Sequence, residues 1–222
     1  MTEDEFIAHH PRLYHIAEGG SWPSIQRHGL ESTSAILDRF EVNGPIRVAI
    51  ESARRATSER LEHEQHESVV IRDQKPISES KLEAALRGMT TAEWYTMLNR
   101  YVFLWPSFDR CNGMLSSYGD QDHDVLTIDT QRLLDVYGGQ LMLSPINSGN
   151  TLCDAAPRGA DTFVQLSQCP FDDWRRHKKQ RPEKVIAEVT IPYRIENVEQ
   201  FAVQVESYSG SELTGTIWES PA

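Results

Sequence analysis

The sequence predicts an α+β fold in which short helices lie at the margins of a mixed or antiparallel sheet. Segments with helical periodicity alternate irregularly with segments rich in β-branched and aromatic residues, unlike the regular βαβα order of a parallel sheet. The 222 residues are 39% hydrophobic and 25% charged, as in ordinary globular proteins. At this length roughly 70% of the unfolded chain's surface can be buried. We therefore expect one domain over residues 1–222, with a core from about residue 10 to 207 and an irregular C-terminal tail.

The first half of the chain predicts strands among short helices. Residues 13–16 predict a strand. A helix should follow, because Ser21 suits the N-cap, Pro23 the first turn and Gly29 the position after the last turn. Periodicity then predicts helices at residues 33–40, 45–64, 80–86 and 91–98, and strands at residues 68–72 and 101–105.

The second half continues in the same mixed manner. A short helix to about residue 115 should precede a strand at residues 125–128. A helix at residues 130–137 should end at Gly138 and Gly139. Further strands are expected at residues 140–143, 184–191 and 201–206.

Composition and charge exclude several classes of function. The chain has 33 acidic and 22 basic residues, a net charge of -11, and such a field repels bulk polyanions, which argues against a general DNA-coating role. The N-terminus lacks the basic and apolar regions of a signal peptide, and the apolar run at residues 101–105 is far shorter than the ~20 residues of a membrane span. We therefore expect a cytoplasmic protein that contacts no membrane. No GxSxG, P-loop, GxGxxG or kinase motif is present.

Cysteine and histidine spacing does not predict a metal site. Cys111, Cys153 and Cys169 are an odd number without a close pair, which predicts reduced and mostly buried thiols. His63 and His66 are spaced i,i+3 and could bind a metal on a helix face. No further ligands are obviously supplied, so surface decoration is the simpler interpretation and we expect no metal.

Two single residues are candidates for chemistry. Glu188 lies within the strand expected at residues 184–191, on a face shared with Ile186 and Thr190. A carboxylate in the middle of a strand is costly to bury unless it is paired or used, although this face could simply be exposed to solvent. His15 lies near the end of the first strand, where it can point into a cleft or serve as an ordinary structural histidine.

Two segments are candidates for binding. Residues 143–150 form a polar loop directly after a strand, and its backbone N–H groups with Ser and Asn side chains could hold a nucleotide or form an ordinary connection. Residues 175–184 carry six of the 22 basic residues. This run could contact the phosphates of a nucleic acid or nucleotide, or it could only increase solubility.

Taken in order, these segments resemble the DarT-like branch of the ADP-ribosyltransferase superfamily. Its Tyr-His-Ile-Thr strand and the helix after it are similar to Leu13-Tyr14-His15-Ile16, Trp22-Pro23-Ser24-Ile25 and Gly29. Its aromatic strand and its glutamate-bearing strand are similar to Tyr101-Val102-Phe103-Leu104-Trp105 and Ala187-Glu188-Val189. The chain as a whole also looks like an uncharacterised bacterial domain family marked by Ile71-Arg72-Asp73, the segment 102–105 and the segment 143–149.

The sequence departs from the DarT-like pattern at two places. Ala17 stands where the first strand of the family has Thr, and residues 105–110 replace its Phe-x-Pro-Arg-Ser segment. The catalytic arginine of the family lies upstream of the aromatic strand. Arg72 is our first choice for its equivalent and Arg100 the second.

The resemblance implies a split sheet that binds NAD as a substrate. Glu188 would stabilise the positive charge that develops as nicotinamide leaves, and Arg72 would hold the pyrophosphate. Binding of the dinucleotide is implied for the first strand, the aromatic strand and the loop, through His15, Tyr14, Tyr101, Trp105, Ser144, Asn147 and Ser148. The acceptor, a single-stranded nucleic acid or a protein, would be gripped by Arg175, Arg176, Lys178 and Lys179.

The resemblance therefore implies an NAD-dependent ADP-ribosyltransferase, for which a toxin or phage-defence role with an antitoxin or other partner protein is expected. RNA 2′-phosphotransfer is a second enzymatic alternative on a related fold, but that class carries Arg immediately before its first His, where this chain has Tyr14. A nucleotide-binding or interaction module that keeps the fold without turnover is the third.

Overall fold

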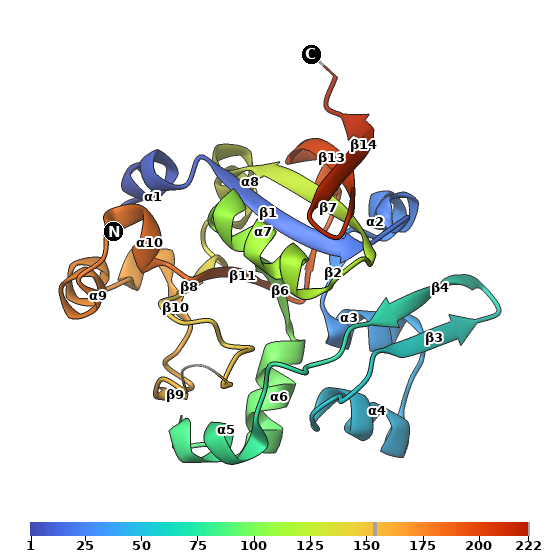
Figure 1. Cartoon of the computed structure of the whole chain (residues 1–222), viewed down its shortest axis with the longest axis horizontal. Coiled ribbons are helices and arrows are strands. Elements are labelled where there is room, and N and C mark those ends of the chain that lie inside the picture. Colours follow the sequence, from blue (N-terminus) through green and yellow to red (C-terminus); the bar gives the residue numbers. More distant parts are fainter. Residues whose placement is uncertain (153–154, 222) are drawn as a thin grey trace.

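The computed structural model of the chain has an α+β architecture built around two antiparallel sheets (Figure 1). It describes residues 1–152 and 155–221. Helices lie around the sheets rather than between successive parallel strands, as Figure 1 shows. The expected α+β class with a split antiparallel sheet and peripheral helices is therefore confirmed. Cys153 lies outside the described residues, whereas Cys111 and Cys169 are free, buried thiols.

The first sheet has the order β1-β7-β13-β14, with every neighbouring pair antiparallel. Its strands are β1 (Arg12–Glu18), β7 (Asp122–Asp129), β13 (Ala202–Ser209) and β14 (Glu212–Glu219). β7 lies inside the sheet and is buried from His123 to Ile128, as its central position requires. β14 occupies the edge and is mostly exposed.

The second sheet has the order β10-β8-β11-β6, again antiparallel throughout. Its strands are β10 (Val164–Gln165), β8 (Met142–Ser144), β11 (Glu188–Pro192) and β6 (Tyr101–Leu104). The two sheets meet where Tyr14 of β1 forms an isolated antiparallel bridge with Trp105, just beyond β6. Their reciprocal N–H to O distances are 2.9 and 2.7 Å. The bridge places β1 beside β6, and β11 one strand farther on.

Short helices and small strand pairs complete the described fold. The helices are α1 (Glu3–His9), α2 (Trp22–His28), α3 (Thr33–Arg39), α4 (Gly44–Glu51), α5 (Glu79–Ala85), α6 (Thr91–Asn99), α7 (Phe108–Ser117), α8 (Thr130–Tyr137), α9 (Phe171–Lys178) and α10 (Pro182–Val185). The small strands are β2 (Leu30–Glu31), β3 (Glu59–His63), β4 (His66–Ile71), β5 (Leu86–Arg87), β9 (Arg158–Gly159) and β12 (Arg194–Ile195). Single 3-10 turns occur at Leu166–Gln168 and Val198–Gln200. Within these ranges no helix combines the length and apolarity needed to cross a membrane.

The largest apolar core joins the two sheets. It contains Leu13 of β1, Leu126 of β7, Leu104 of β6 and Val189 of β11, with Phe6 from α1. Because aliphatic side chains from both sheets pack into one cluster, the junction between β1 and β6 is held on its buried side. A second core lies under α5 and α6 and includes Phe163, which stands between β9 and β10.

Gly29 shows why a glycine ends α2. Its φ of 79° lies in the left-handed region, where residues with a Cβ are strained. A Cβ there would also collide with the carbonyl oxygen of Ile195, because β2 and β12 pair directly beside this position. Ser21 occupies the expected N-cap, but its side chain makes no cap bond, and the Trp22 N–H donates instead to Asp124 Oδ2 at 3.0 Å.

The helix expected at residues 45–64 is wrong in its second half. α4 ends at Glu51, and residues 59–71 form the β3–β4 hairpin. The Glu and Arg spacing of this segment suits a helix, but the hairpin places Leu61 against the core formed by Leu37, Ile50 and Ile71. His63 and His66 are consequently cross-strand partners with ring centroids 4.8 Å apart, not neighbours on a helix.

Two further boundaries differ from expectation. Residues 182–185 are helical rather than part of a strand, because Pro182 suits the first turn of α10, and β11 begins at Glu188. The C-terminus is not irregular, since β14 pairs with β13 along Glu212–Glu219. Its exposed residues carry little hydrophobic patterning, which explains why sequence reasoning missed it.

Candidate functional site

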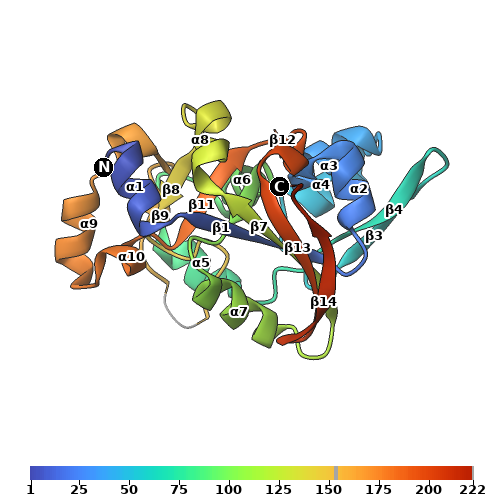
Figure 2. The same cartoon turned by 90° about the horizontal axis from the view of Figure 1, so that it is seen from above.

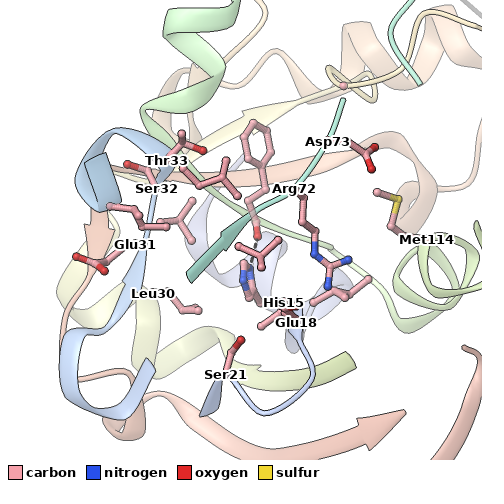
Figure 3. A pocket seen from close by; sticks show the side chains of 18 of the residues that line it. His15, Glu18, Ser21, Leu30, Glu31, Ser32, Thr33, Arg72, Asp73 and Met114 are labelled. Atoms are coloured by element: carbon pink, nitrogen blue, oxygen red, sulfur yellow. Dashed lines mark hydrogen bonds between the residues drawn. The ribbon is translucent and has the colours of Figure 1, made fainter. Parts of the chain in front are cut away.

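The junction between the two sheets opens into a cavity of about 840 Å³ (Figure 3). β1 contributes His15 to its lining, β11 contributes Glu188, and the segment after β4 contributes Arg72. The cavity therefore brings together three side chains that are far apart in the sequence. Its volume lies within the range of small-molecule sites, roughly 300–1,000 Å³.

Glu188 is the buried acid of this cavity. Its residue is only 4% exposed, so the alternative of a solvent-facing strand is not what the structure adopts. Oε1 accepts a hydrogen bond from the Ser148 N–H at 3.0 Å, whereas Oε2 has no partner among the described residues. Burial raises the pKa of Glu188 to about 7, although hydrogen bonding from Ser148 and the charges of Arg158 and Arg110 oppose this rise. The carboxyl group is thus poised to change charge near neutral pH.

His15 offers an acceptor to the same cavity. Its Nδ1 lies 2.9 Å from the Phe103 carbonyl oxygen, a bond marked in Figure 3. A carbonyl only accepts, so Nδ1 carries the proton. Burial lowers the pKa of His15 to about 4, and the nearby Arg72 charge adds to the effect. The ring is therefore neutral at pH 7, and its Nε2 presents a lone pair to a ligand donor.

The loop after β8 divides into a structural part and a cavity part. Ser144 is fully buried, and its Oγ donates to the Ile146 carbonyl oxygen at 2.9 Å, so it closes the turn and does not line the cavity. Asn147 and Ser148 do line it. The polar loop thus supplies backbone and side-chain groups to the cavity that Glu188 lines, and nucleotide binding by Asn147 and Ser148 stays a prediction.

The cavity is also lined by arginines that lack acidic partners. Arg55, Arg72 and Arg110 all reach it, and none of them forms an ion pair within the described residues. The Arg72 guanidinium stands over the Tyr118 ring at 4.4 Å, and Nη2 lies 2.8 Å from His123 Nδ1. Its buried Nη1 has no partner among the described residues. The lining also contains Glu18, Glu31, Glu67, Asp73 and Glu188, so the feature that favours an anionic ligand is the unpartnered Nη1 of Arg72.

The second-choice arginine lies elsewhere. Arg100 lines a separate surface depression with Glu93 and Met97, and its carbonyl oxygen accepts the Tyr193 N–H at 2.7 Å. Among the two arginines considered from the sequence, only Arg72 reaches the cavity of His15 and Glu188.

Of the three aromatic residues named from the sequence, two line the cavity and one does not. Tyr101 and Trp105 both line the cavity, and Tyr101 also packs on Phe163 with ring centroids 5.0 Å apart. Tyr14 does not line it, because alternation along β1 turns its ring to the opposite face, where it packs on Phe108 at 5.6 Å.

The basic run lies outside the cavity. Arg175, Arg176 and Lys179 line a separate open depression of about 540 Å³ on α9, at the end of the molecule away from the β3–β4 hairpin (Figure 2). Lys178 Nζ donates to the Pro145 and Val185 carbonyl oxygens, so this side chain fastens the polar loop to α10. Only the end of the run, in α10, comes close to Glu188 along the chain. Most of its charged side chains are exposed to solvent.

Sequence reasoning missed two arginines near Glu188. Arg110 lines the cavity from α7, and burial lowers its pKa while the Glu188 charge raises it. Arg158 is buried behind the polar loop. Neither stands in a recognisable motif, and only the spacing of Arg110, Gly113, Met114 and Ser117 along one helix face could have indicated a lining helix. In the described ranges, no three or more His, Cys, Asp or Glu side chains form a group that could hold a metal.

Comparison with known proteins gives a family and distant structural likenesses. The model of the family of unknown function DUF7002 matches residues 11–202. No curated protein matches the sequence. The structure is similar to Thermosipho africanus DarTG in complex with ADP-ribose, with 12% sequence identity and a TM-score of 0.47. The similarity covers 87% of this chain and 43% of that chain, so this chain spans less than half of the solved one.

Proposed function

The chain belongs to the DUF7002 family, and for it we propose an NAD-dependent ADP-ribosyltransferase that acts in the cytoplasm. The observation that carries the proposal is the single cavity that contains both His15 and Glu188, with an unpartnered Glu188 oxygen. The DarT-like motifs around these two residues are the reason for proposing NAD as the substrate and ADP-ribosyl transfer as the reaction. The arginines without acidic partners supply the positive charge that a pyrophosphate requires.

In the proposed reaction the glycosidic bond between the nicotinamide-side ribose and nicotinamide breaks. Nicotinamide leaves with the bonding electron pair, and positive charge develops on the ribose. Ionised Glu188 accepts a hydrogen bond from the ribose 2′-OH through Oε2 and stabilises this charge, while Ser148 holds Oε1. An acceptor lone pair then forms the new bond to the ribose carbon, and the acceptor's proton passes to Glu188 or to water.

The remaining cavity residues bind and orient the dinucleotide. His15 Nε2 accepts a hydrogen bond from a ribose hydroxyl, because its Nδ1 is already committed to Phe103. Arg72 binds the pyrophosphate through its free Nη1. Tyr101 and Trp105 offer aromatic surface for stacking with nicotinamide. No metal is required for this chemistry.

The acceptor belongs to a different surface. We propose a single-stranded nucleic acid or a protein that lies along α9 and reaches the cavity past α10. Arg175, Arg176 and Lys179 are exposed there and are suited to phosphate contacts. A base acceptor must be unstacked to be reached, which favours single strands. A toxin role with an antitoxin partner would agree with such an activity.

Release of nicotinamide from NAD tests the proposal. The wild-type protein, Glu188→Gln and the matched control Glu183→Gln are incubated with NAD and with single-stranded DNA, RNA or protein acceptors. Glu183 is an exposed glutamate on α10, five positions before Glu188, and does not line the cavity. We expect release by the wild type and the control, and a loss of at least about 100-fold in Glu188→Gln. Equal release by all three proteins rejects the catalytic role of Glu188.

A non-catalytic nucleotide-binding module is the alternative. It is supported by the lack of a clear counterpart to the family's upstream arginine, since Arg72 is assigned by position in the cavity alone. Calorimetric binding of NAD or ADP-ribose without nicotinamide release over several hours would favour this alternative. Binding weakened about tenfold by His15→Phe would place the nucleotide in the same cavity.

A further inference from the structure

A buried arginine lies directly behind the polar loop of the cavity. Arg158 is 2% exposed and does not line the cavity. Its Nη1 donates to the Ser148 carbonyl oxygen at 2.9 Å, and Nη2 donates to the Asn150 carbonyl oxygen at 3.3 Å. One guanidinium therefore binds two carbonyl groups of the same turn, a geometry that suits the planar fork of arginine and not the single ammonium of lysine.

The same turn contacts Glu188 on its other side. The N–H of Ser148 donates to Glu188 Oε1 at 3.0 Å, while the carbonyl group of Ser148 is bound by Arg158. Both backbone groups of Ser148 are thus fixed, one by the acid and one by the cation. Arg158 therefore restrains the same residue whose N–H group binds the carboxylate, and Glu188 Oε2 has no hydrogen-bond partner among the described residues.

Arg158 is itself held by elements independent of the cavity. Its backbone pairs in parallel with Leu86, and the next residue, Gly159, pairs with Arg87. A Cβ at Gly159 would lie 2.5 Å from the Arg87 carbonyl oxygen, so the close approach of β5 and β9 requires glycine there. The guanidinium also stands 5.8 Å from the centroid of the buried Trp94 ring. The arginine is therefore anchored by the core under α5 and α6.

We propose that Arg158 is the positioning residue of the site, which orients Glu188 through Ser148. This inference rests on the proposed transferase function for its catalytic consequence, but its structural consequence at Glu188 does not depend on turnover. Arg158 touches no substrate in this arrangement. It acts on the reaction by setting the geometry and the charge of the acid.

Two substitutions separate the geometric effect from the charge effect. Arg158→Lys keeps the positive charge but loses the forked donors, so we expect nicotinamide release to slow on the order of 100-fold with KM for NAD changed less than about threefold. Arg158→Met also removes the charge, so the midpoint of the pH–rate profile should rise by about one pH unit. We expect Arg158→Lys to keep the pH midpoint of the wild type while its rate stays low. This combination would distinguish a positioning role from simple support of the fold, which would not separate the two quantities.

A second measurement follows Glu188 without turnover. Carbon-13 NMR of labelled glutamate carboxyl groups, assigned with Glu188→Gln, gives its titration midpoint. We expect a rise of about one pH unit in Arg158→Met and faster hydrogen exchange at the Ser148 amide in both variants. Arg47→Met is the matched control, because Arg47 also forms several hydrogen bonds but lies on α4, outside the cavity.

The outcomes distinguish this inference from the proposed function. A wild-type protein that releases no nicotinamide rejects the transferase, while an NMR midpoint unchanged in Arg158→Met rejects the positioning role. Unchanged exchange at Ser148 in Arg158→Lys also rejects it, and this variant remains informative if Arg158→Met does not fold. An equal shift in Arg47→Met would show that the effect is not specific to the loop.

Discussion

Replacement of Glu188 by glutamine should stabilise the protein at neutral and alkaline pH. The carboxyl group is 4% exposed, and burial raises its pKa to about 7 from a value of 4.5 in the absence of the fold. An ionised carboxylate at this place has one oxygen without a partner among the described residues. Glutamine keeps the oxygen that accepts from Ser148 but cannot ionise, so Glu188→Gln removes the cost of the buried charge.

The magnitude follows from the pKa difference. A shift from 4.5 to about 7 corresponds, at ~1.4 kcal/mol per unit, to a full penalty of about 3 kcal/mol. Between pH 4.5 and 7 the folded protein retains a proton on Glu188 that the unfolded chain has released. Raising the pH through this window therefore lowers the free energy of unfolding of the wild type, and the penalty is complete above about pH 7.

Urea denaturation at pH 5, 6, 7 and 8 measures this effect. The free energy of unfolding of Glu188→Gln minus that of the wild type should increase by about 2.5 kcal/mol from pH 5 to pH 8. His10 and His15, whose pKa values burial lowers to about 4, contribute in the opposite direction but cancel in the difference. The exposed-site control Glu183→Gln should show no such trend. A difference that stays constant within about 0.5 kcal/mol across this range would refute the burial argument.

Three further outcomes are expected. His15→Phe removes the Nε2 acceptor and should weaken NAD binding by about tenfold in isothermal titration, with an unchanged unfolding midpoint as the check on folding. Gly29→Ala should lower the free energy of unfolding by more than about 1 kcal/mol in urea titrations, because φ is 79° and a Cβ meets the Ile195 carbonyl. Arg175→Glu with Arg176→Glu should abolish filter binding of single-stranded DNA while calorimetric NAD binding stays unchanged, since both residues lie outside the cavity.

Secondary structure was predicted correctly where a local sequence pattern marks it. Pro106 and the aromatic run before it predicted β6, and the turn at Gly29 predicted the end of α2. The candidate acid and histidine could be named because a polar residue within an apolar strand is unusual. Their meeting in one cavity depends on the Tyr14–Trp105 bridge, which joins residues 91 positions apart and leaves no local pattern.

The errors concern segments in which tertiary pairing outweighs local preference. Residues 59–63 have helix-compatible charge spacing, yet the β3–β4 pairing buries Leu61 and turns them into a strand. β14 is stabilised by β13 rather than by its own exposed side chains. Arg158 could not be identified from the sequence for the same reason. Its proposed role depends on carbonyl groups of a preceding loop and on the pairing of β9 with β5.

The net charge of the chain and the charge of its cavity have opposite consequences. A charge of -11 repels a long polyanion at a distance, but at physiological ionic strength such fields decay over about 8 Å. Within the cavity the nearest charges therefore dominate, and Arg55, Arg72 and Arg110 form no ion pair within the described residues, although Asp73 acts on Arg55 and Glu188 on Arg110. Burial lowers the pKa of Arg55 to about 10 and also lowers that of Arg110, because their charges are met by carbonyl hydrogen bonds rather than by ion pairs. On the proposed function, a small phosphate-bearing ligand that enters the cavity relieves this cost at each guanidinium it contacts, whereas the acidic exterior repels an extended polyanion.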